Sequence, residues 1–288
     1  MKNKTMKKYA LFVSILISFV AQSQDKKAYQ LFDANGKKTT YKKLIAKAAE
    51  TEVVLFGEYH NNAISHWLEL EVTMDVAQKK NIVLGAEMLE ADNQKQVDQY
   101  LKGEINQKQL DSTARLWKNY ATDYKPLVDF AKEKNAPFVA TNIPRRYASL
   151  VSKKGFDVLT TLTEEEKSWI APLPMPYDAS LPGYTNMLKM MGEHTSENMP
   201  KAQATKDAAM AHFIVKNLQS NAVFIHYNGT FHSDNFDGIN WYLKQYKPSV
   251  KIVTIATVEQ ADVSKLEKEN LKKADFILVI DENVTKTY

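Results

Sequence analysis

The chain has 288 residues, of which 44% are hydrophobic and 25% are charged, and it contains no cysteine. It therefore cannot form a disulfide bond or carry the acylated thiol of a bacterial lipoprotein. Its formal net charge of +4 comes from four lysines in the first 24 residues, so the remainder is formally neutral. This balance argues against a nucleic-acid partner and against a polybasic membrane-binding patch.

The first 24 residues have the three parts of a secretory signal peptide. Basic residues at 2–8 precede an apolar run over 9–21, and Ser23 follows close behind. The apolar run is shorter than the roughly 20 residues that a membrane-spanning helix needs. We therefore favour a cleaved signal over an uncleaved anchor or a buried helix, with cleavage between Ala21 and Asp25. The product is expected to be soluble in the periplasm or secreted, with no stable membrane anchor.

Six short apolar runs after the signal predict strands. They are nearly continuous in apolar residues, as is typical of strands covered on both faces, and lie at 52–56, 81–86, 137–141, 222–227, 251–256 and 276–280. Amphipathic stretches such as 64–78 and 124–133 alternate with them. This alternation predicts an α/β fold, a three-layer sandwich with a mainly parallel sheet, in a single domain over 25–288.

The interval between the third and fourth runs interrupts this alternation. We expect an inserted helical subdomain over about 143–220, with helices at 145–153, 163–169 and 201–218. Prolines at alternate positions in 171–177 exclude a regular helix there and predict an extended surface segment. Tyrosines and methionines then follow up to residue 191. This apolar, aromatic neighbourhood fits either plain packing against the sheet or a rim over a ligand pocket.

Two matching G-x-x-H tetrapeptides follow predicted strands, one at Gly57–His60 and one at Gly229–His232. With 9 glycines and 6 histidines in 288 residues, chance predicts well under one occurrence. Glycine lets the backbone turn sharply, so that each histidine projects beyond the end of its strand. The carboxyl ends of parallel strands are where open sheets bind ligands.

Other polar residues arrive at the same predicted edge. Glu87 and Asn142 follow the second and third strands, so they are expected near the two G-x-x-H motifs. The candidate catalytic residues, which are also the candidate metal ligands, are Glu58, His60, Glu87 and His232. Two imidazoles with two carboxylates suit Zn, Mn or Co, and they equally suit acid–base catalysis without a metal.

Several other residues are open to two interpretations. His66 fits either a supporting role beside the site or a place on a helix surface, and Arg145 either binds a carboxylate or begins a solvated helix. His226 lies inside a predicted strand, where a buried structural role is expected. His194 and His212 show no local partner pattern.

The motifs in their order resemble the ChaN-like haem-binding uptake family of the Tiki superfamily. The resemblance spans roughly residues 50–245 and rests on the segments GEYHNN (57–62), GAEM (85–88), WKNYATDYKP (117–126), ATNIPR (140–145), DAAMA (207–211) and GTFH (229–232). It implies an exported haem-binding protein involved in iron or haem uptake, with a homodimer as a fair expectation. In the wider superfamily, the paired motifs line a hydrolytic site, which by position would be Glu58, His60, Glu87 and His232.

Two functions follow from the residues and the resemblance. In the first, the chain binds haem, with Tyr184 or Tyr177 as a phenolate ligand, His60, His66 or His194 as alternatives, and Arg145 near a propionate. In the second, it is a metal-dependent or histidine-base hydrolase of the Tiki or erythromycin-esterase type, acting through the strand-end site. No G-x-S-x-G motif is present. A third possibility is a binding protein that has kept the fold and lost the chemistry.

Overall fold

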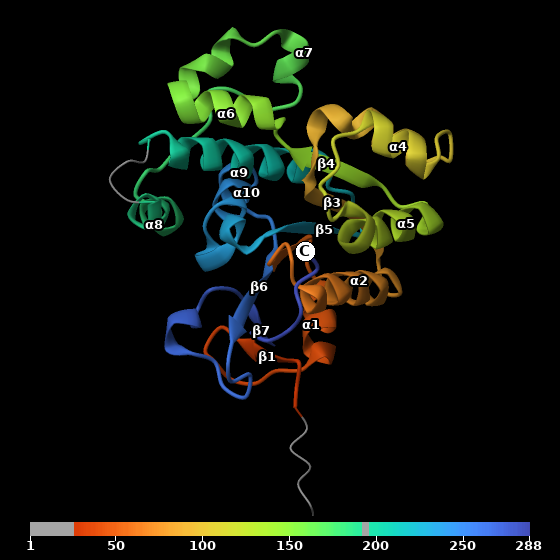
Figure 1. The fold of residues 1–288 in the computed structure, drawn as a ribbon, viewed down its shortest axis with the longest axis vertical. Helices are drawn as coiled ribbons and strands as arrows, with labels where there is room; N and C mark the ends of the chain where they lie inside the picture. The colour runs from red at the N-terminus through yellow and green to blue at the C-terminus, as the bar shows by residue number, and fades with distance from the viewer. Residues whose placement is uncertain (1–25, 192–195) are drawn as a thin grey trace, which may run out of the picture.

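A computed structural model describes residues 26–191 and 196–288. The predicted signal peptide at 1–24 and the candidate ligand His194 therefore lie outside the described residues. Elsewhere the chain forms a seven-stranded sheet in the order β1-β7-β6-β2-β5-β3-β4, which runs through the middle of the molecule (Figure 1). The strands are β1 (Tyr29–Asp33), β2 (Val53–Glu58), β3 (Asn81–Glu90), β4 (Phe138–Asn142), β5 (Ala222–Gly229), β6 (Ile252–Gln260) and β7 (Phe276–Asp281).

All neighbouring strands pair in parallel except β1, which pairs antiparallel to β7 at the sheet edge. Every residue of β2 is buried, because β5 and β6 flank it in the sheet and helices cover both faces. The six predicted strands are present, and β3 and β6 continue beyond the predicted ends. The edge strand β1 was not predicted.

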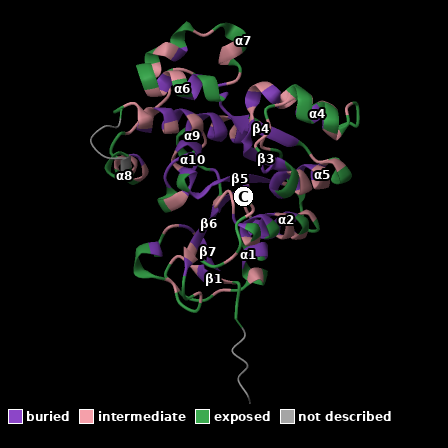
Figure 2. Ribbon diagram, in the orientation of Figure 1, coloured by how far each residue is buried: buried purple, intermediate pink, exposed green. Residues whose placement is uncertain are grey.

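Alternate residues of β2 enter two different cores. Val54 and Phe56 pack on the side of α1 (Tyr41–Ala48), α2 (Ala63–Ala77) and α5 (Lys125–Lys134), together with Leu68 of α2. On the opposite face, Val53 and Leu55 pack with residues of α9 (Met199–Lys216) and α10 (Ile239–Tyr246). Figure 2 shows the buried sheet between helices that are exposed on their outer faces. The fold is the predicted α/β sandwich with a mainly parallel sheet.

The remaining helices surround this frame. The short helices α3 (Gln94–Leu101) and α4 (Gln107–Thr113) lie between β3 and β4 in the chain. Between β4 and β5 come α6 (Arg145–Lys154), α7 (Glu164–Lys167), α8 (Pro182–Met191) and α9. Residues 171–181 contain no helix, as the prolines predict, and α8 begins at Pro182, where a proline is tolerated in the first turn. Within the described ranges, no helix has the length and apolar character needed to cross a membrane.

Candidate functional site

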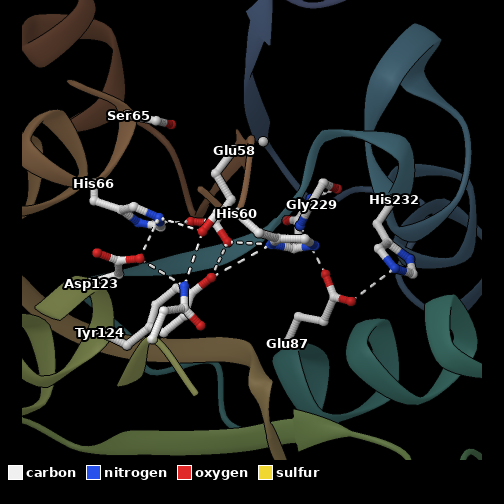
Figure 3. Close-up of polar contacts among 12 residues, drawn as sticks. Glu58, His60, Ser65, His66, Glu87, Asp123, Tyr124, Gly229 and His232 are labelled. Atoms are coloured by element: carbon white, nitrogen blue, oxygen red, sulfur yellow. Dashed lines mark hydrogen bonds and ion pairs between the residues drawn. The ribbon is translucent and has the colours of Figure 1, made fainter. Parts of the chain in front are cut away.

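The candidate site lies at the carboxyl ends of three adjacent strands, β2, β5 and β3. Glu58 is the last residue of β2, Gly229 is the last residue of β5, and Glu87 lies near the end of β3. His60 and His232 follow β2 and β5, as predicted. Figure 3 shows Glu58 between the rings of His60 and His66, and Glu87 between Gly229 and His232.

His60 is held by a buried carboxylate. Its Nδ1 lies 2.7 Å from Glu58 Oε1, and the same oxygen accepts a hydrogen bond from the hydroxyl of Tyr124 at 2.7 Å. The ring of Trp117 meets the His60 ring edge-on, with centroids 4.8 Å apart. The side chain of His60 is 34% exposed, whereas that of Glu58 is fully buried. One nitrogen of His60 is therefore oriented by a carboxylate, while part of the ring faces solvent.

His66 lies behind Glu58, on the first turn of α2. Asn62 caps this helix by accepting hydrogen bonds from the backbone N–H groups of Ile64 and Ser65, which fixes where the turn begins. His66 Nδ1 lies 3.1 Å from Glu58 Oε2 and 3.0 Å from Glu69 Oε2. Its Nε2 lies 3.0 Å from the backbone carbonyl of His60. His66 is thus a buried partner of Glu58 and does not lie on the helix surface.

His232 occupies a second buried chain of hydrogen bonds. Its Nε2 lies 3.1 Å from Glu87 Oε1, and its Nδ1 lies 2.5 Å from Asp207 Oδ1. The other oxygen of Asp207 accepts a hydrogen bond from the Tyr184 hydroxyl at 2.9 Å. Glu87 Oε2 accepts the backbone N–H of Gly229 at 2.8 Å. Both carboxylates of this chain are therefore fixed from two sides.

Gly229 joins the two histidine–carboxylate pairs. A Cβ atom at this position would lie 2.8 Å from both Cε1 and Nε2 of His60 and 3.5 Å from Glu87 Oε2. Only glycine leaves room for the imidazole to lie against the end of β5. The four predicted residues Glu58, His60, Glu87 and His232 therefore do lie at one edge, arranged as two pairs separated by a glycine.

Two carboxylates of the site, Glu58 and Glu87, stay ionised despite their burial. Burial raises the pKa of Glu58, but the hydrogen bond with His60 and the charge of His66 outweigh it and lower the pKa to about 2. Burial likewise opposes ionisation of Glu87, yet the charge of His232 holds its pKa well below the usual range. Burial disfavours the charged form of His232, but Glu87 and Asp207 raise its pKa to about 9. Glu87 and His232 therefore form an imidazolium–carboxylate ion pair at neutral pH. Burial disfavours the charged form of His60, but Glu58 and Glu87 raise its pKa above the ordinary value.

The predicted cofactor-binding residues are spread over the molecule. Tyr184 is buried at 3% exposure with its hydroxyl bonded to Asp207, and Tyr177 is partly buried with its ring stacked on that of Tyr184 at 5.7 Å. Arg145 is exposed on the first turn of α6. His66 is buried beside Glu58. The structure brings Tyr177 and Tyr184 together but places His66 at a different site.

Sequence reasoning missed four polar residues of the site. Asp207 and Tyr124 lie in two of the segments that carry the family resemblance, DAAMA and WKNYATDYKP, but no role was assigned to them. Glu69 follows His66 by three residues and so shares its helix face. Asp123 also reaches this region, accepting hydrogen bonds from Asn119 and Thr287. Among the described residues, Glu58, His66 and Glu69 are the group whose ligand atoms lie close enough to share one metal ion.

A hollow of about 450 Å³ lies next to the hydrogen-bonded series Glu87–His232–Asp207. It is bounded by α8 and by the turn after β5, and its wall contains Met187, Met190, Gln203, Phe231 and Lys273. Gln203 Nε2 also lies 3.0 Å from His232 Nδ1, so the hollow borders the strand-end site. Met190 and Phe231 are 73% and 67% exposed, which is unusual for large apolar side chains.

Solved structures share this fold. ChaN of Campylobacter jejuni, reported with cofacial haem binding, superposes with a TM-score of 0.67 at 18% identity, covering 89% of this chain and 98% of that one. A Bacillus cereus protein gives a TM-score of 0.51 at 11% identity, covering 88% and 95%. A succinoglycan biosynthesis protein gives 0.51 at 10% identity, covering 88% and 94%. At these identities the likeness shows the fold alone.

No match is found among curated protein sequences. A family model described as haem-binding uptake, Tiki superfamily, ChaN matches residues 44–243, which is more than half of the chain. This range includes both G-x-x-H motifs, Glu87 and the helices between β4 and β5. The chain therefore belongs to the ChaN family of haem-binding uptake proteins in the Tiki superfamily.

Proposed function

We propose that this protein binds haem in the hollow between α8 and the turn after β5. Membership of the ChaN family supports haem as the ligand. The observation that carries the location is the exposure of Met190 and Phe231 at the wall of a hollow of about 450 Å³. A flat apolar macrocycle would cover both side chains and remove their apolar surface from water.

The polar groups of the same hollow fit the rest of a haem molecule. Lys273 lines it and provides a cation for a propionate. Methionine and tyrosine are known axial ligands of haem iron, and Met187, Met190 and Tyr184 all lie in the wall. Burial and the nearby Asp207 raise the pKa of Tyr184 above its ordinary value, so its phenolate is disfavoured where it stands. Bound haem would supply an iron centre, while these residues hold and orient it.

The haem proposal is tested by titrating the protein with haemin. We expect a shifted Soret band that saturates near one haem per chain. The double variant Met187→Ala/Met190→Ala should bind haem about tenfold or more weakly, while Met74→Ala, a partly exposed methionine on α2, should bind as the wild type does. An unshifted Soret band would contradict the proposal, and so would equal haem affinity of the double variant and the Met74→Ala control. Tyr184→Phe and Tyr177→Phe test the predicted phenolate ligands by their spectra.

We further propose that haem is bound for iron or haem uptake outside the cytoplasm, by a chain exported through its N-terminal signal, and that two chains associate. The basic and apolar pattern of residues 1–24 supports export. Mass spectrometry of the protein from its own cells tests cleavage between Ala21 and Asp25. Sedimentation with and without haemin tests the dimer, and an unchanged monomer in both conditions would rule it out.

A second function is favoured by a separate observation, the two histidine–carboxylate pairs at the strand ends. His60 is oriented by Glu58 through Nδ1 and remains partly exposed, which is the arrangement of a general acid–base residue. His232 and Glu87 are buried beside it. We propose hydrolysis of an ester or amide as the alternative function, with His60 moving the proton at Nε2.

The hydrolase proposal predicts that His60→Ala abolishes turnover of a panel of ester and peptide substrates. Loss of a positioned acid–base residue costs a factor of about 10² to 10⁴. His212→Ala, at a histidine of α9 outside the site, should leave turnover unchanged. If haem binding survives His60→Ala and no substrate of the panel is cleaved by the wild type, the hydrolase proposal fails while the haem proposal stands.

A further inference from the structure

Three buried side chains behind His60 converge on one point. Glu58 reaches it from the end of β2, whereas His66 and Glu69 come from one face of α2, three residues apart. Their exposed fractions are 1%, 7% and 0%. One ligand atom from each residue lies within 4.8 Å of the others. Figure 3 shows the ring of His66 directed at the Glu58 carboxylate.

The hydrogen bond made by His66 Nε2 leaves Nδ1 as the ring nitrogen that can bind a metal ion. Its Nε2 lies 3.0 Å from the His60 carbonyl, and a carbonyl can only accept, so Nε2 carries the hydrogen. Nδ1 lies 3.1 Å from Glu58 Oε2 and 3.0 Å from Glu69 Oε2, so it either donates a proton to these carboxylates or, where a metal ion replaces that proton, presents its lone pair to the ion. Three lone-pair donors facing one another repel unless a cation or a proton lies between them.

The two carboxylates also have oxygens with nothing to accept. Within the described part of the chain, Glu58 Oε2 and Glu69 Oε1 are buried and have no hydrogen-bond partner. Native proteins rarely leave buried carboxylate oxygens unsatisfied, and such atoms mark a missing ion or water. Asp123 adds a further carboxylate 3.5 Å from His66 Nε2, so negative groups outnumber the single imidazole. Burial opposes a charge on His66, but Glu58 and Glu69 raise its pKa to about 11, so these carboxylates attract a cation, either a proton or a metal ion.

We propose that Glu58, His66 and Glu69 bind one divalent transition-metal ion, with Zn²⁺ as the first choice. Carboxylate oxygens and an imidazole nitrogen bind such ions at about 2.0–2.2 Å, which in the tetrahedral geometry of Zn²⁺ places neighbouring ligand atoms about 3.3–3.6 Å apart. Nδ1 lies 3.0 and 3.1 Å from the two carboxylates, a few tenths of an ångström less than that spacing, so small movements of the side chains would admit the ion. Two carboxylates and one imidazole form a borderline ligand set that suits Zn, Mn and Co.

The surroundings support the ligands in the way that metal sites require. A metal-bound histidine usually donates its second nitrogen to a carbonyl or carboxylate, and His66 donates to the His60 carbonyl. Tyr124 and His60 both hold the other oxygen of Glu58. His66 also forms part of the wall of a surface hollow of about 300 Å³ with Asp123 and Thr287, which gives an ion a route from solvent. This inference does not depend on haem binding.

Metal titration tests the proposal. The protein is stripped with a chelator, then titrated with Zn²⁺ by calorimetry and with Co²⁺ by visible absorption. We expect one equivalent to bind, with cobalt d–d bands shaped by nitrogen and oxygen ligands. Glu69→Gln keeps the side-chain volume but removes a charged ligand, and it should lower the affinity about 100-fold. Glu71→Gln, on the same helix but outside the group, should leave the affinity unchanged.

Two further variants locate the ion. His66→Asn should remove the cobalt bands, whereas His232→Gln should preserve them, because His232 belongs to the other hydrogen-bond chain. Loss of the cobalt bands in His232→Gln but not in His66→Asn would place the ion on the residues predicted from the sequence and overturn the proposal. Those residues are Glu58, His60, Glu87 and His232. Failure of the stripped wild type to bind one equivalent, or unchanged affinity in Glu69→Gln, would mean that a proton alone bridges Glu58 and Glu69. Circular dichroism of each variant checks that it is folded.

Discussion

Two neighbouring regions of this protein are built on opposite principles. The strand-end site is buried and polar, and its charged side chains contact one another across different elements, as in the hydrogen-bonded series Glu87–His232–Asp207. The hollow beside α8 is exposed and apolar, with Met190 and Phe231 facing solvent. The first region contributes to the stability of the fold, whereas the second leaves apolar surface unburied. Such surface on a folded protein indicates a binding site.

The comparison is tested most strongly by His232→Leu. This change removes the imidazolium between Glu87 and Asp207 and leaves both carboxylates buried without their cation. Breaking a buried ion pair on one side costs about 3–5 kcal/mol of unfolding free energy. Urea denaturation of wild type and variant measures it. A decrease of less than about 1 kcal/mol in the unfolding free energy would mean that the hydrogen-bonded series Glu87–His232–Asp207 does not stabilise the fold.

A pH-dependent loss of stability is expected from His226, which is fully buried in β5 beside Thr141 and Asn228. Burial lowers its pKa to about 4, against about 6.5 in the unfolded chain, so the unfolded state binds the proton more tightly. The stabilisation is complete above pH 6.5 and is lost as the pH falls toward 4, by about 3 kcal/mol in total.

Comparison with His226→Gln isolates this contribution. The variant cannot titrate at this position, so its unfolding free energy should fall less steeply than that of the wild type between pH 6.5 and 4. Chemical denaturation at several pH values measures both slopes. Parallel curves would show that His226 is not the residue responsible.

Gly229→Ala should have a smaller effect on stability. The added Cβ would lie 2.8 Å from the His60 ring, so the imidazole must move away from the end of β5. Overpacking of this kind costs about 1–3 kcal/mol. Calorimetric melting measures the cost, and the NMR signals of His60 report the displacement. An unchanged His60 environment would show that the ring does not depend on this glycine.

Met190→Ala should have the smallest effect on stability. The side chain is 73% exposed, so its truncation is expected to change the unfolding free energy by less than about 0.5 kcal/mol. The same variant is expected to weaken haem binding, and the combination separates a binding surface from a structural one. A large destabilisation, measured by urea denaturation, would show that the hollow belongs to the core.

The two regions also differ in how far the sequence predicts them. Continuous apolar runs predicted six strands because a strand covered on both faces needs apolar side chains at every position. The edge strand β1 has one partner and a partly exposed surface, so its composition carries a weaker signal. Glu58, His60, Glu87 and His232 were predicted at one edge because residues that follow parallel strands must emerge there.

By itself the sequence determined the strand-helix alternation and the positions of the two G-x-x-H motifs, since both depend on neighbours along the chain. The tertiary structure decided which side chains contact the predicted site residues. Asp207 reaches His232 from a helix 25 residues away, and Tyr124 reaches Glu58 across 66 residues. The order β2-β5-β3 brings those ends together, and Gly229 leaves room for His60 between them. Such contacts depend on how elements pack in space, which local patterns do not encode.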